Sequence, residues 1–285
     1  MTIIDGKATG AKIRAQITKD TLQFKEKYGF VPGLAVVIVG DDPASKVYVR
    51  NKKLACDEVG FYSEEYALSA NTTEQELLAL IDKLNNKKEI HGILVQSPLP
   101  PHLDEAIIIN NILPEKDVDA FHPVNVGKIM IGDYDFVPCT PMGVMELLKE
   151  YNIDPCGKKC VVVGRSNIVG KPMAMLMVHA NATVTICHSK TKELSEALKQ
   201  ADIIIMAIGK AKFLKDESIK QDAVIIDVGM NRDENGKLCG DCDFDLCSKK
   251  ASFITPVPGG VGPMTITMLM KNTYTAAKLF AEKNS

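Results

Sequence analysis

The stretch best suited to binding an anion joins a short apolar run to the start of a helix. The run, Cys160–Val163, is mostly β-branched and ends at Gly164, which is typical of a strand buried on both faces. Gly170 and Pro172 then open a helix, because proline fits a first turn. Backbone N–H groups and the helix dipole would point at whatever lies over the turn. The pattern predicts the phosphate-binding corner of a Rossmann unit.

Two polar side chains stand in this turn, whose usual fingerprint is G-x-G-x-x-G. Arg165 and Ser166 follow Gly164, so serine replaces the middle glycine and the turn is longer. The Ser166 hydroxyl can donate to a phosphate oxygen, and Arg165 adds a fixed cation beside it. The alternative is an ordinary strand-to-helix turn of an α/β domain.

The end of the next predicted strand favours NADP over NAD. That strand, Thr183–Cys187, is followed by His188, Ser189 and Lys190. An NAD site has Asp or Glu at this point to hold the ribose hydroxyl, and positions 188–190 contain neither. With Arg165, these side chains would surround a 2′-phosphate instead. The alternative for His188 is a half-exposed loop histidine.

A second group of polar residues shares one face of a helix expected over residues 44–59. Ser45, Tyr48 and Lys52 recur at spacings of three and four. A lysine that is desolvated or placed beside positive charge loses its proton more readily, so Lys52 can serve in proton transfer. The alternatives are a solvated helix lysine and a core tyrosine.

Two loops follow the predicted strand His91–Gln96. Ser97–Pro101 contains three prolines and must be a stiff loop at the carboxyl end of the strand, where open α/β sheets bind ligands. Pro114–Asn125 is polar and carries Asp117 and Asp119. A carboxylate there can accept hydrogen bonds from ligand N–H groups, and a turn-forming aspartate is the alternative.

The remaining stretches predict helices that alternate with strands, and hence an α/β protein with mostly parallel sheets. Helices are expected over residues 8–27, 72–86, 140–151 and 264–281, and further strands over residues 33–40, 62–68, 203–207, 224–227 and 252–255. Residues 256–263, PVPGGVGP, are too rich in glycine and proline for anything but a loop. We place a domain boundary near Pro138.

Composition is that of an ordinary soluble protein. A net charge of −2 over 285 residues gives no global attraction for nucleic acid or an anionic membrane. No apolar run approaches the ~18 residues that span a bilayer, and the N-terminus lacks a signal-peptide core, so a cytoplasmic location is expected. Cys239, Cys242 and Cys247 resemble half of a zinc site without its second half, so we expect buried thiols and no metal.

Seven motifs in order resemble one family, the bifunctional methylenetetrahydrofolate dehydrogenase/methenyltetrahydrofolate cyclohydrolases (FolD). They are S-x-x-Y-x-x-x-K from Ser45, QSPLPP from Gln96, PEKDVDAFHPVN from Pro114, VVGRSNIVGKPM from Val162, CHS from Cys187, DVGMNR from Asp227 and TPVPGGVGPMT from Thr255. The resemblance covers almost the full length. One departure is Ala120, where the family pattern has glycine.

This resemblance implies a folate-binding catalytic domain over residues 1–138 and an NADP-binding Rossmann domain over residues 139–263, with folate in the cleft between them. The closing helix, residues 264–285, would return to the first domain. The family implies a homodimer that oxidises 5,10-methylenetetrahydrofolate with NADP and hydrolyses the methenyl product to 10-formyltetrahydrofolate. Its place would be one-carbon metabolism, which serves purine, methionine and histidine synthesis.

The resemblance also implies roles for single residues. Lys52 would transfer protons during hydrolysis, hydrogen-bonded to Gln96 and supported by Ser45. Tyr48 would stack on the aminobenzoate ring of folate, and Asp119 would bind the pterin. Folate would also contact Pro98, Leu99, Pro258, Gly259 and Gly260, while NADP would contact Gly164, Arg165, Ser166, Gly170, His188, Ser189 and Met230.

Three alternatives compete with this interpretation. A shikimate- or amino-acid-type dehydrogenase shares the two-domain plan but needs no tyrosine for an aminobenzoate ring. A family member with a single activity and a non-catalytic NADP-binding sensor are the others.

Overall fold

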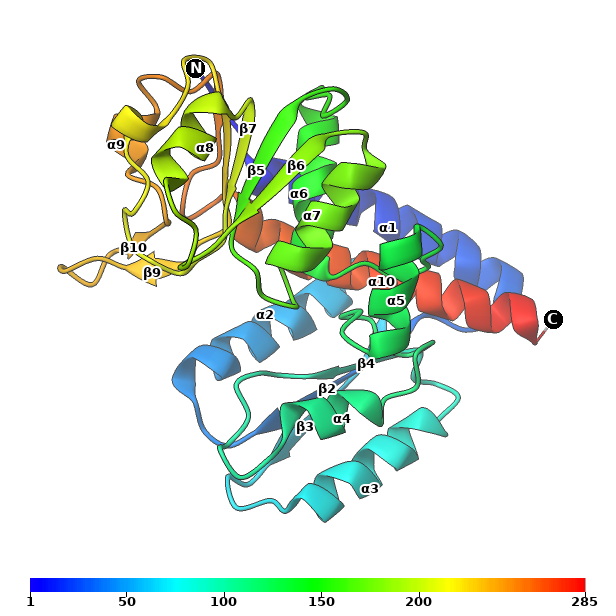
Figure 1. Ribbon diagram of the computed structural model, residues 1–285. Coiled ribbons are helices and arrows are strands. Elements are labelled where there is room, and N and C mark those ends of the chain that lie inside the picture. Colours follow the sequence, from blue (N-terminus) through cyan, green and yellow to red (C-terminus); the bar gives the residue numbers. More distant parts are fainter. Residues whose placement is uncertain (285) are drawn as a thin grey trace. The chain divides into compact units, whose positions relative to one another are not determined.

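The computed structural model describes residues 1–284, the side chain of Ala44 excepted, as two compact units (Figure 1). Unit 1 comprises Met1–Ala11 and Thr140–Thr265, and unit 2 comprises Lys12–Cys139 and the chain from Ile266 onward. The N-terminal residues belong to unit 1 because β1 (Thr2–Ile3) pairs with β11 (Phe253–Ile254). The domain boundaries inferred from the sequence stay a prediction.

Unit 1 is built on a six-stranded sheet in the order β1-β11-β8-β7-β5-β6, with every neighbouring pair parallel. The other strands are β5 (Lys159–Val163), β6 (Thr183–Cys187), β7 (Ile203–Met206) and β8 (Val224–Asp227). Strands β5, β7 and β8 are apolar because helices cover both faces. These are α6 (Cys139–Glu150) and α7 (Gly170–His179) on one face, and α8 (Leu194–Gln200) and α9 (Phe244–Cys247) on the other (Figure 1).

Two smaller features complete unit 1. Strands β9 (Asn231–Arg232) and β10 (Leu238–Cys239) form a separate antiparallel pair, and a 3-10 turn spans Asp216–Ser218. Cys239, Cys242 and Cys247 are buried free thiols.

Unit 2 contains a three-stranded parallel sheet in the order β3-β2-β4, made of β2 (Gly33–Val39), β3 (Tyr62–Leu68) and β4 (Gly92–Val95). Helices α3 (Glu74–Asn85) and α4 (Glu105–Asn110) pack on one face of β2, and α2 (Pro43–Val59) covers the other (Figure 1). Successive side chains of β2 point to opposite faces, so the whole strand is buried. Helix α5 (Pro123–Ile131) and most of α1 (Gly6–Tyr28) and α10 (Val261–Lys283) complete the unit.

Both sheets contain a point where the order of strands reverses. Strand β2 is followed in sequence by β3 on one side and β4 on the other, and β5 is followed by β6 on one side and β7 on the other. Ligands of open parallel sheets bind outside the carboxyl ends of strands at such a switch point. This topology indicates one site after β2 and β4 and a second after β5 and β7.

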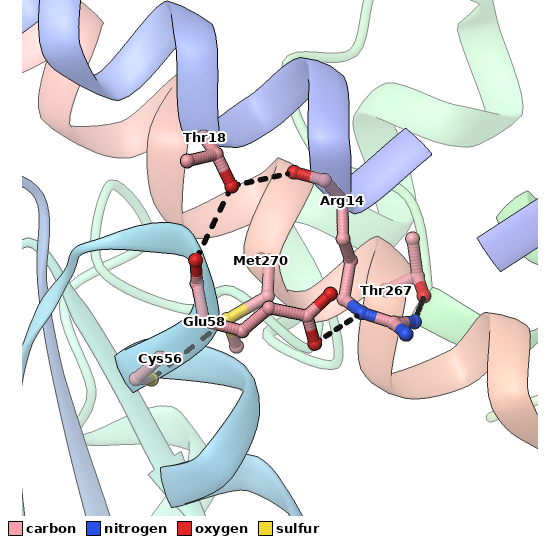
Figure 2. Close-up of polar contacts among 6 residues, drawn as sticks. All are labelled: Arg14, Thr18, Cys56, Glu58, Thr267 and Met270. Carbon is pink, nitrogen blue, oxygen red and sulfur yellow. Dashed lines mark hydrogen bonds and ion pairs between the residues drawn. The ribbon is translucent and has the colours of Figure 1, made fainter. Parts of the chain in front are cut away.

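Polar contacts fix helix α2 to α1 and α10 within unit 2 (Figure 2). Arg14 donates through Nε to Glu58 Oε2 at 2.9 Å and through Nη1 to Thr267 Oγ1 at 2.8 Å. The Thr18 hydroxyl donates to the Glu58 carbonyl at 3.3 Å. Because three helices are joined at this point, the face of α2 that carries Lys52 has little freedom to rotate.

Most predicted elements are confirmed, and two predicted loops are wrong where proline lies in the first turn of a helix. The predicted loop over residues 256–263 is wrong at its end, because α10 begins at Val261 with Pro263 in its first turn, where the missing N–H needs no partner. The predicted loop Pro114–Asn125 is likewise wrong at its end, because α5 begins at Pro123 and is capped by His122 Nδ1. Helices α4, α5, α8 and α9 were not predicted. Among residues 1–284, no helix combines the length and apolar character that crossing a membrane requires.

Candidate active site

Lys52 on α2 reaches the carboxyl end of β4. Its Nζ donates to Gln96 Oε1 at 2.7 Å. Gln96 is held in turn, because its backbone N–H donates to the Val37 carbonyl at 2.8 Å and its Nε2 to the Ser97 carbonyl at 2.6 Å. Lys52 is 9% exposed, and this burial lowers the pKa of its ammonium although the charge of Asp119 opposes the shift. The predicted contact between Lys52 and Gln96 is present.

Asp119 lies on the loop that runs beside β4. The Ile93 N–H donates to the Lys116 carbonyl at 2.8 Å, and Ile93 forms a parallel bridge with Asp117, so the loop passes toward the carboxyl end of the strand. Burial raises the pKa of the Asp119 carboxyl to about 6, while the charge of Lys52 lowers it. Burial thus disfavours the charged forms of both the Lys52 amine and the Asp119 carboxyl, which makes each more ready to change its protonation state.

Asp117 has a structural task in the same loop. It is 2% exposed, and its Oδ2 accepts from the His122 N–H at 2.8 Å and from Asn125 Nδ2 at 2.9 Å. These bonds close the turn before α5, which is the role of a turn-forming aspartate, the alternative considered from the sequence.

Two residues beside Asp119 are absent from the candidates found in the sequence. Cys139 Sγ lies 3.7 Å from Asp119 Oδ1. Asn272 Nδ2 donates to the Val118 carbonyl at 2.8 Å and to the Val137 carbonyl at 2.9 Å. It therefore holds the backbone just before Asp119 and the backbone just before Cys139. The only local signal for Asn272 is a short amide side chain inside an otherwise apolar face of α10.

The other predicted folate residues of unit 2 lie on α2 and on the loop after β4. Tyr48 is 36% exposed and is therefore not a core tyrosine. Ser45 is buried, and its backbone N–H donates to the N-cap Asp42 Oδ2 at 2.7 Å. Pro98 is exposed and Leu99 is half-buried. The roles expected of these four residues stay predictions.

In unit 1 two glycines allow the chain to turn tightly after β5. Gly164 has φ +139°, and a Cβ there would lie 2.3 Å from the Ala207 carbonyl oxygen, directly after β7. A Cβ at Gly170 would lie 2.3 Å from the Gly164 carbonyl oxygen. Neither position can carry a side chain without moving backbone. The approach of Gly164 to Ala207 marks the switch point of this sheet, where Rossmann-type sheets bind a dinucleotide.

The side chains of this turn suit a phosphate group. Ser166 Oγ accepts from the backbone N–H of Val169 at 3.1 Å and of Gly170 at 3.3 Å, which leaves the hydroxyl hydrogen available to donate outward. Arg165 beside it is exposed. A close backbone turn, a hydroxyl donor and a guanidinium together fit the pyrophosphate or 2′-phosphate of a dinucleotide.

The loop after β6 adds donors and no acid. His188 Nδ1 accepts from the Lys190 N–H at 3.1 Å, so a neutral ring carries its hydrogen on Nε2 and can donate. Ser189 is exposed and His188 is half-buried, as the loop-histidine alternative also expects.

Met230 and the loop before α10 are also in unit 1. Met230 is 50% exposed and is therefore not a core methionine; a Cβ on Gly262 would lie 3.2 Å from its Cε. Pro258 is exposed, Gly259 has φ +108°, and a Cβ at Gly260 would lie 2.5 Å from a backbone oxygen. The two glycines are thus required by the shape of the loop.

Two buried carboxylates that the sequence did not single out shape the loops after β7 and β8. Asp241 accepts from the N–H groups of Ile208 at 2.7 Å and Lys210 at 2.8 Å, and from Asn231 Nδ2 at 2.9 Å. Asp227, the last residue of β8, accepts from the Asp241 N–H at 2.9 Å, and burial raises the pKa of its carboxyl to about 6. These carboxylates fix the loops that border the switch point of unit 1.

Comparison with known proteins decides between the competing interpretations. Residues 4–119 match the catalytic domain of the tetrahydrofolate dehydrogenase/cyclohydrolase family, and residues 138–281 match its NAD(P)-binding domain. The chain belongs to this family. The resemblance inferred from seven motifs is confirmed, and the shikimate-type alternative is set aside.

Relatives of the tetrahydrofolate dehydrogenase/cyclohydrolase family cover the whole chain. The bifunctional protein FolD of Acetivibrio thermocellus is 60% identical over 280 residues, which is 98% of each chain. The crystal structure of the bifunctional enzyme FolD from Campylobacter jejuni has a TM-score of 0.95 and 52% identity, and covers 98% of this chain and 99% of that one. The Trypanosoma brucei FolD, solved with NADP and an inhibitor, has a TM-score of 0.94, 40% identity and 98% coverage of both chains. The α/β fold class is therefore confirmed.

Proposed function

We propose that this chain oxidises 5,10-methylenetetrahydrofolate with NADP and hydrolyses the 5,10-methenyl product to 10-formyltetrahydrofolate. Family membership over almost the whole chain supports both activities. The observation that carries the assignment of residues is the 2.7 Å bond from the buried Lys52 Nζ to Gln96 Oε1 at the switch point of unit 2. Roles for the individual side chains follow from their surroundings.

The oxidation needs orientation more than it needs a base. When bound, NADP accepts a hydride from the methylene carbon, and the resulting positive charge is shared by two folate nitrogens. The half-exposed ring of Tyr48 offers a surface for the aminobenzoate group, and the Asp119 carboxylate accepts from pterin N–H groups. Two anchors on one substrate hold the reacting carbon in place.

The hydrolysis adds water to the cationic carbon and breaks one C–N bond, with net release of one proton. A side chain must take a proton from water and return one to the leaving nitrogen. Lys52 suits this task because burial lowers the pKa of its ammonium, and the nearby substrate cation would lower that pKa further. Gln96 Oε1 keeps the amine facing the carboxyl end of β4.

The cofactor corner supports NADP in preference to NAD. Arg165, Ser189 and the Nε2 of His188 are donors, and positions 188–190 carry no carboxylate that would repel a 2′-phosphate. Arg165→Ala should weaken NADP binding much more than NAD binding, as measured by titration of both cofactors. Equal losses would refute this assignment.

We propose a cytoplasmic homodimer that acts in one-carbon metabolism for purine, methionine and histidine synthesis. Free cysteines suit a reducing compartment. Strand β6 lies at the edge of the six-stranded sheet, and Ile186 on it is 39% exposed, so this edge offers a pairing surface to a second chain. Ile186→Lys should shift the mass measured by light scattering toward the monomer.

One spectrophotometric run tests both activities. Methylenetetrahydrofolate with NADP should yield NADPH, and methenyl absorbance should rise and then decay. If the methenyl product decays only at the uncatalysed hydrolysis rate, the chain has the dehydrogenase activity alone. If no NADPH is formed, the proposal is contradicted. Shikimate in place of the folate is the matched control.

A further inference from the structure

A cavity of about 540 Å³ lies in unit 2, and its lining shares no residue with those assigned to folate or NADP. It is bordered by the end of α3, the segment before β4, the loop that carries Glu115 and the last turns of α10. Four lysines and one glutamate line it: Lys87, Lys88, Lys116, Lys283 and Glu115. Lys87 is ion-paired with Glu64 outside this lining, and the remaining charges still leave the walls basic.

Lys116 is a buried lysine without a carboxylate partner. It is 8% exposed, and its Nζ donates to the Leu84 carbonyl at 3.1 Å and to the Lys87 carbonyl at 2.8 Å. An ammonium has three hydrogens, so one is left over. Within residues 1–284 no ion pair joins this amine to an acid. Burial lowers the pKa of this ammonium although the charges of Glu115 and Glu89 oppose the shift, so these acids do not fully offset the cost of burying the charge. A bound anion at the amine would offset the rest.

His91 brings a second donor to the same cavity. It is 3% exposed, and its Nδ1 accepts from the Gly33 N–H at 3.0 Å, so the neutral ring carries its hydrogen on Nε2. Burial, together with the nearby charge of Lys116, lowers the pKa of the ring to about 4, which keeps the ring neutral at pH 7. Nε2 has no hydrogen-bond partner among the described residues.

The orientation of His91 is fixed by aromatic neighbours. Phe30 stacks on its ring with centroids 5.3 Å apart, and Phe280 meets it edge-on at 5.1 Å. The ring cannot turn to find another acceptor without breaking these contacts and the bond to Gly33. The third hydrogen of the Lys116 ammonium and the Nε2 hydrogen of His91 thus belong to residues that line the same cavity.

We propose that this cavity binds a small organic anion, with its charged group beside Lys116 and its flat apolar body against Leu113, Leu279 and Phe280. The anion would supply the counter-charge of Lys116 and an acceptor for His91. A neutral ligand would leave Lys116 without a counter-charge, and an inorganic anion would leave the apolar wall unused. A neighbouring cavity of about 470 Å³ shares Lys88, His91 and Phe280, and gives a flat body further room.

Calorimetric titration of the full-length protein with 2-naphthoate tests the proposal, with neutral 2-naphthol as the matched ligand. Saturating NADP and a folate analogue are present throughout, so that the folate and cofactor sites are filled. We expect one naphthoate per chain and binding at least about tenfold weaker for naphthol. Lys116→Met should weaken naphthoate about tenfold or more and leave naphthol unchanged.

Two further variants complete the experiment. Lys46→Met is the matched control, because Lys46 is an exposed lysine of unit 2 that pairs with Asp41 outside the cavity. Lys283→Met replaces an exposed lysine of the cavity rim and should weaken naphthoate about threefold, which serves if Lys116→Met does not fold. The proposal is overturned by an absence of saturable binding, by naphthoate affinity unchanged in both cavity variants, or by an equal loss in Lys46→Met.

Discussion

Lys52 and Lys53 are neighbours in sequence with opposite surroundings. Lys52 is 9% exposed and bonded to Gln96, whereas Lys53 lies about 100° further round α2 and is exposed. Burial lowers the pKa of the Lys52 ammonium, so this amine gives up its proton more readily than an ordinary lysine.

Lys52→Met should therefore abolish the hydrolysis of methenyltetrahydrofolate, with a loss of about 100-fold or more, because general acid–base catalysis is removed. Lys53→Met is the matched control and should keep the parent rate. The decay of methenyl absorbance measures both. Hydrolysis by Lys52→Met at the parent rate would remove this amine from the mechanism.

The role proposed for Asp119 predicts that folate binding depends on pH. Burial raises the pKa of its carboxyl from 3.8 to about 6, so the folded protein binds this proton more tightly than the unfolded chain. The stability contributed by the group is full below pH 3.8 and is lost as pH rises through about 6. The proposed folate contact depends on pH in the opposite direction, because only the ionised carboxylate would accept from the pterin N–H groups.

We expect the dissociation constant of a folate analogue to rise about tenfold for each pH unit below 6. Asp119→Asn should bind the analogue weakly with no slope between pH 5 and 7, while its NADP affinity stays that of the parent. Fluorescence titration with both ligands measures this. A parent-like folate affinity in the variant would count against the pterin role.

At the scale of single elements, the turn after β5 depends on glycine for space. A Cβ at Gly170 would lie 2.3 Å from the Gly164 carbonyl oxygen, so alanine must displace the turn that holds Arg165 and Ser166. Gly127 in α5 is the matched control, because a Cβ there meets nothing within 4 Å.

Gly170→Ala should lose about 1–3 kcal/mol of unfolding free energy and bind NADP about tenfold more weakly. Gly127→Ala should gain about 1 kcal/mol from helix propensity and leave NADP binding unchanged. Urea unfolding measures the change in unfolding free energy, and NADP titration measures the change in affinity. Equal stability changes in both variants would show that the turn has room for a side chain.

Helix α10 supports Asp119 through one amide. Asn272 is 1% exposed and donates to the Val118 and Val137 carbonyls. Asn272→Ala removes both hydrogen bonds and leaves the Val118 carbonyl with only the weak Cys139 thiol donor at 3.6 Å. The expected cost is about 2–3 kcal/mol of unfolding free energy, together with a higher KM for folate and an unchanged KM for NADP. A rise in both KM values would indicate a general loss of structure instead.

The sequence predicts these elements well where the signal is local. Strands Tyr62–Leu68 and Thr183–Cys187 begin and end as predicted, because alternation and turn residues are properties of adjacent positions. The start of α10 was missed because the glycines and prolines before Met264 predict a loop, although proline is also tolerated in the first turn of a helix. The pairing of Asn272 with the segments of Val118 and Val137 depends on packing between distant parts of the chain, which no local pattern encodes.

The backbone conformation at Ala120 explains why the family pattern has glycine at this position. Ala120 has φ +59° and is fully buried, so glycine at this position in the family pattern matches a left-handed conformation. Alanine adopts it at a cost of about 1–2 kcal/mol, and its buried methyl group offsets part of that cost. The loop conformation next to Asp119 is therefore reached with alanine as well.

At the scale of the whole molecule, two helices contribute residues to both units. Helix α1 contains Gly6–Tyr28, of which the residues up to Ala11 belong to unit 1; α10 begins at Val261 in unit 1 and continues in unit 2 from Ile266. An α-helix is one hydrogen-bonded element, so unwinding it in one unit removes part of the other. We therefore predict a single calorimetric unfolding transition.

NADP gives a stricter test of the single unfolding transition, because all the residues assigned to NADP binding lie in unit 1. At about 100 times its dissociation constant NADP should add about 2.7 kcal/mol of stability and move the entire transition to higher temperature. Scanning calorimetry with and without NADP measures the shift, and NAD at the same concentration is the control. Two separate transitions, of which NADP moves only one, would show that the shared helices do not couple the units.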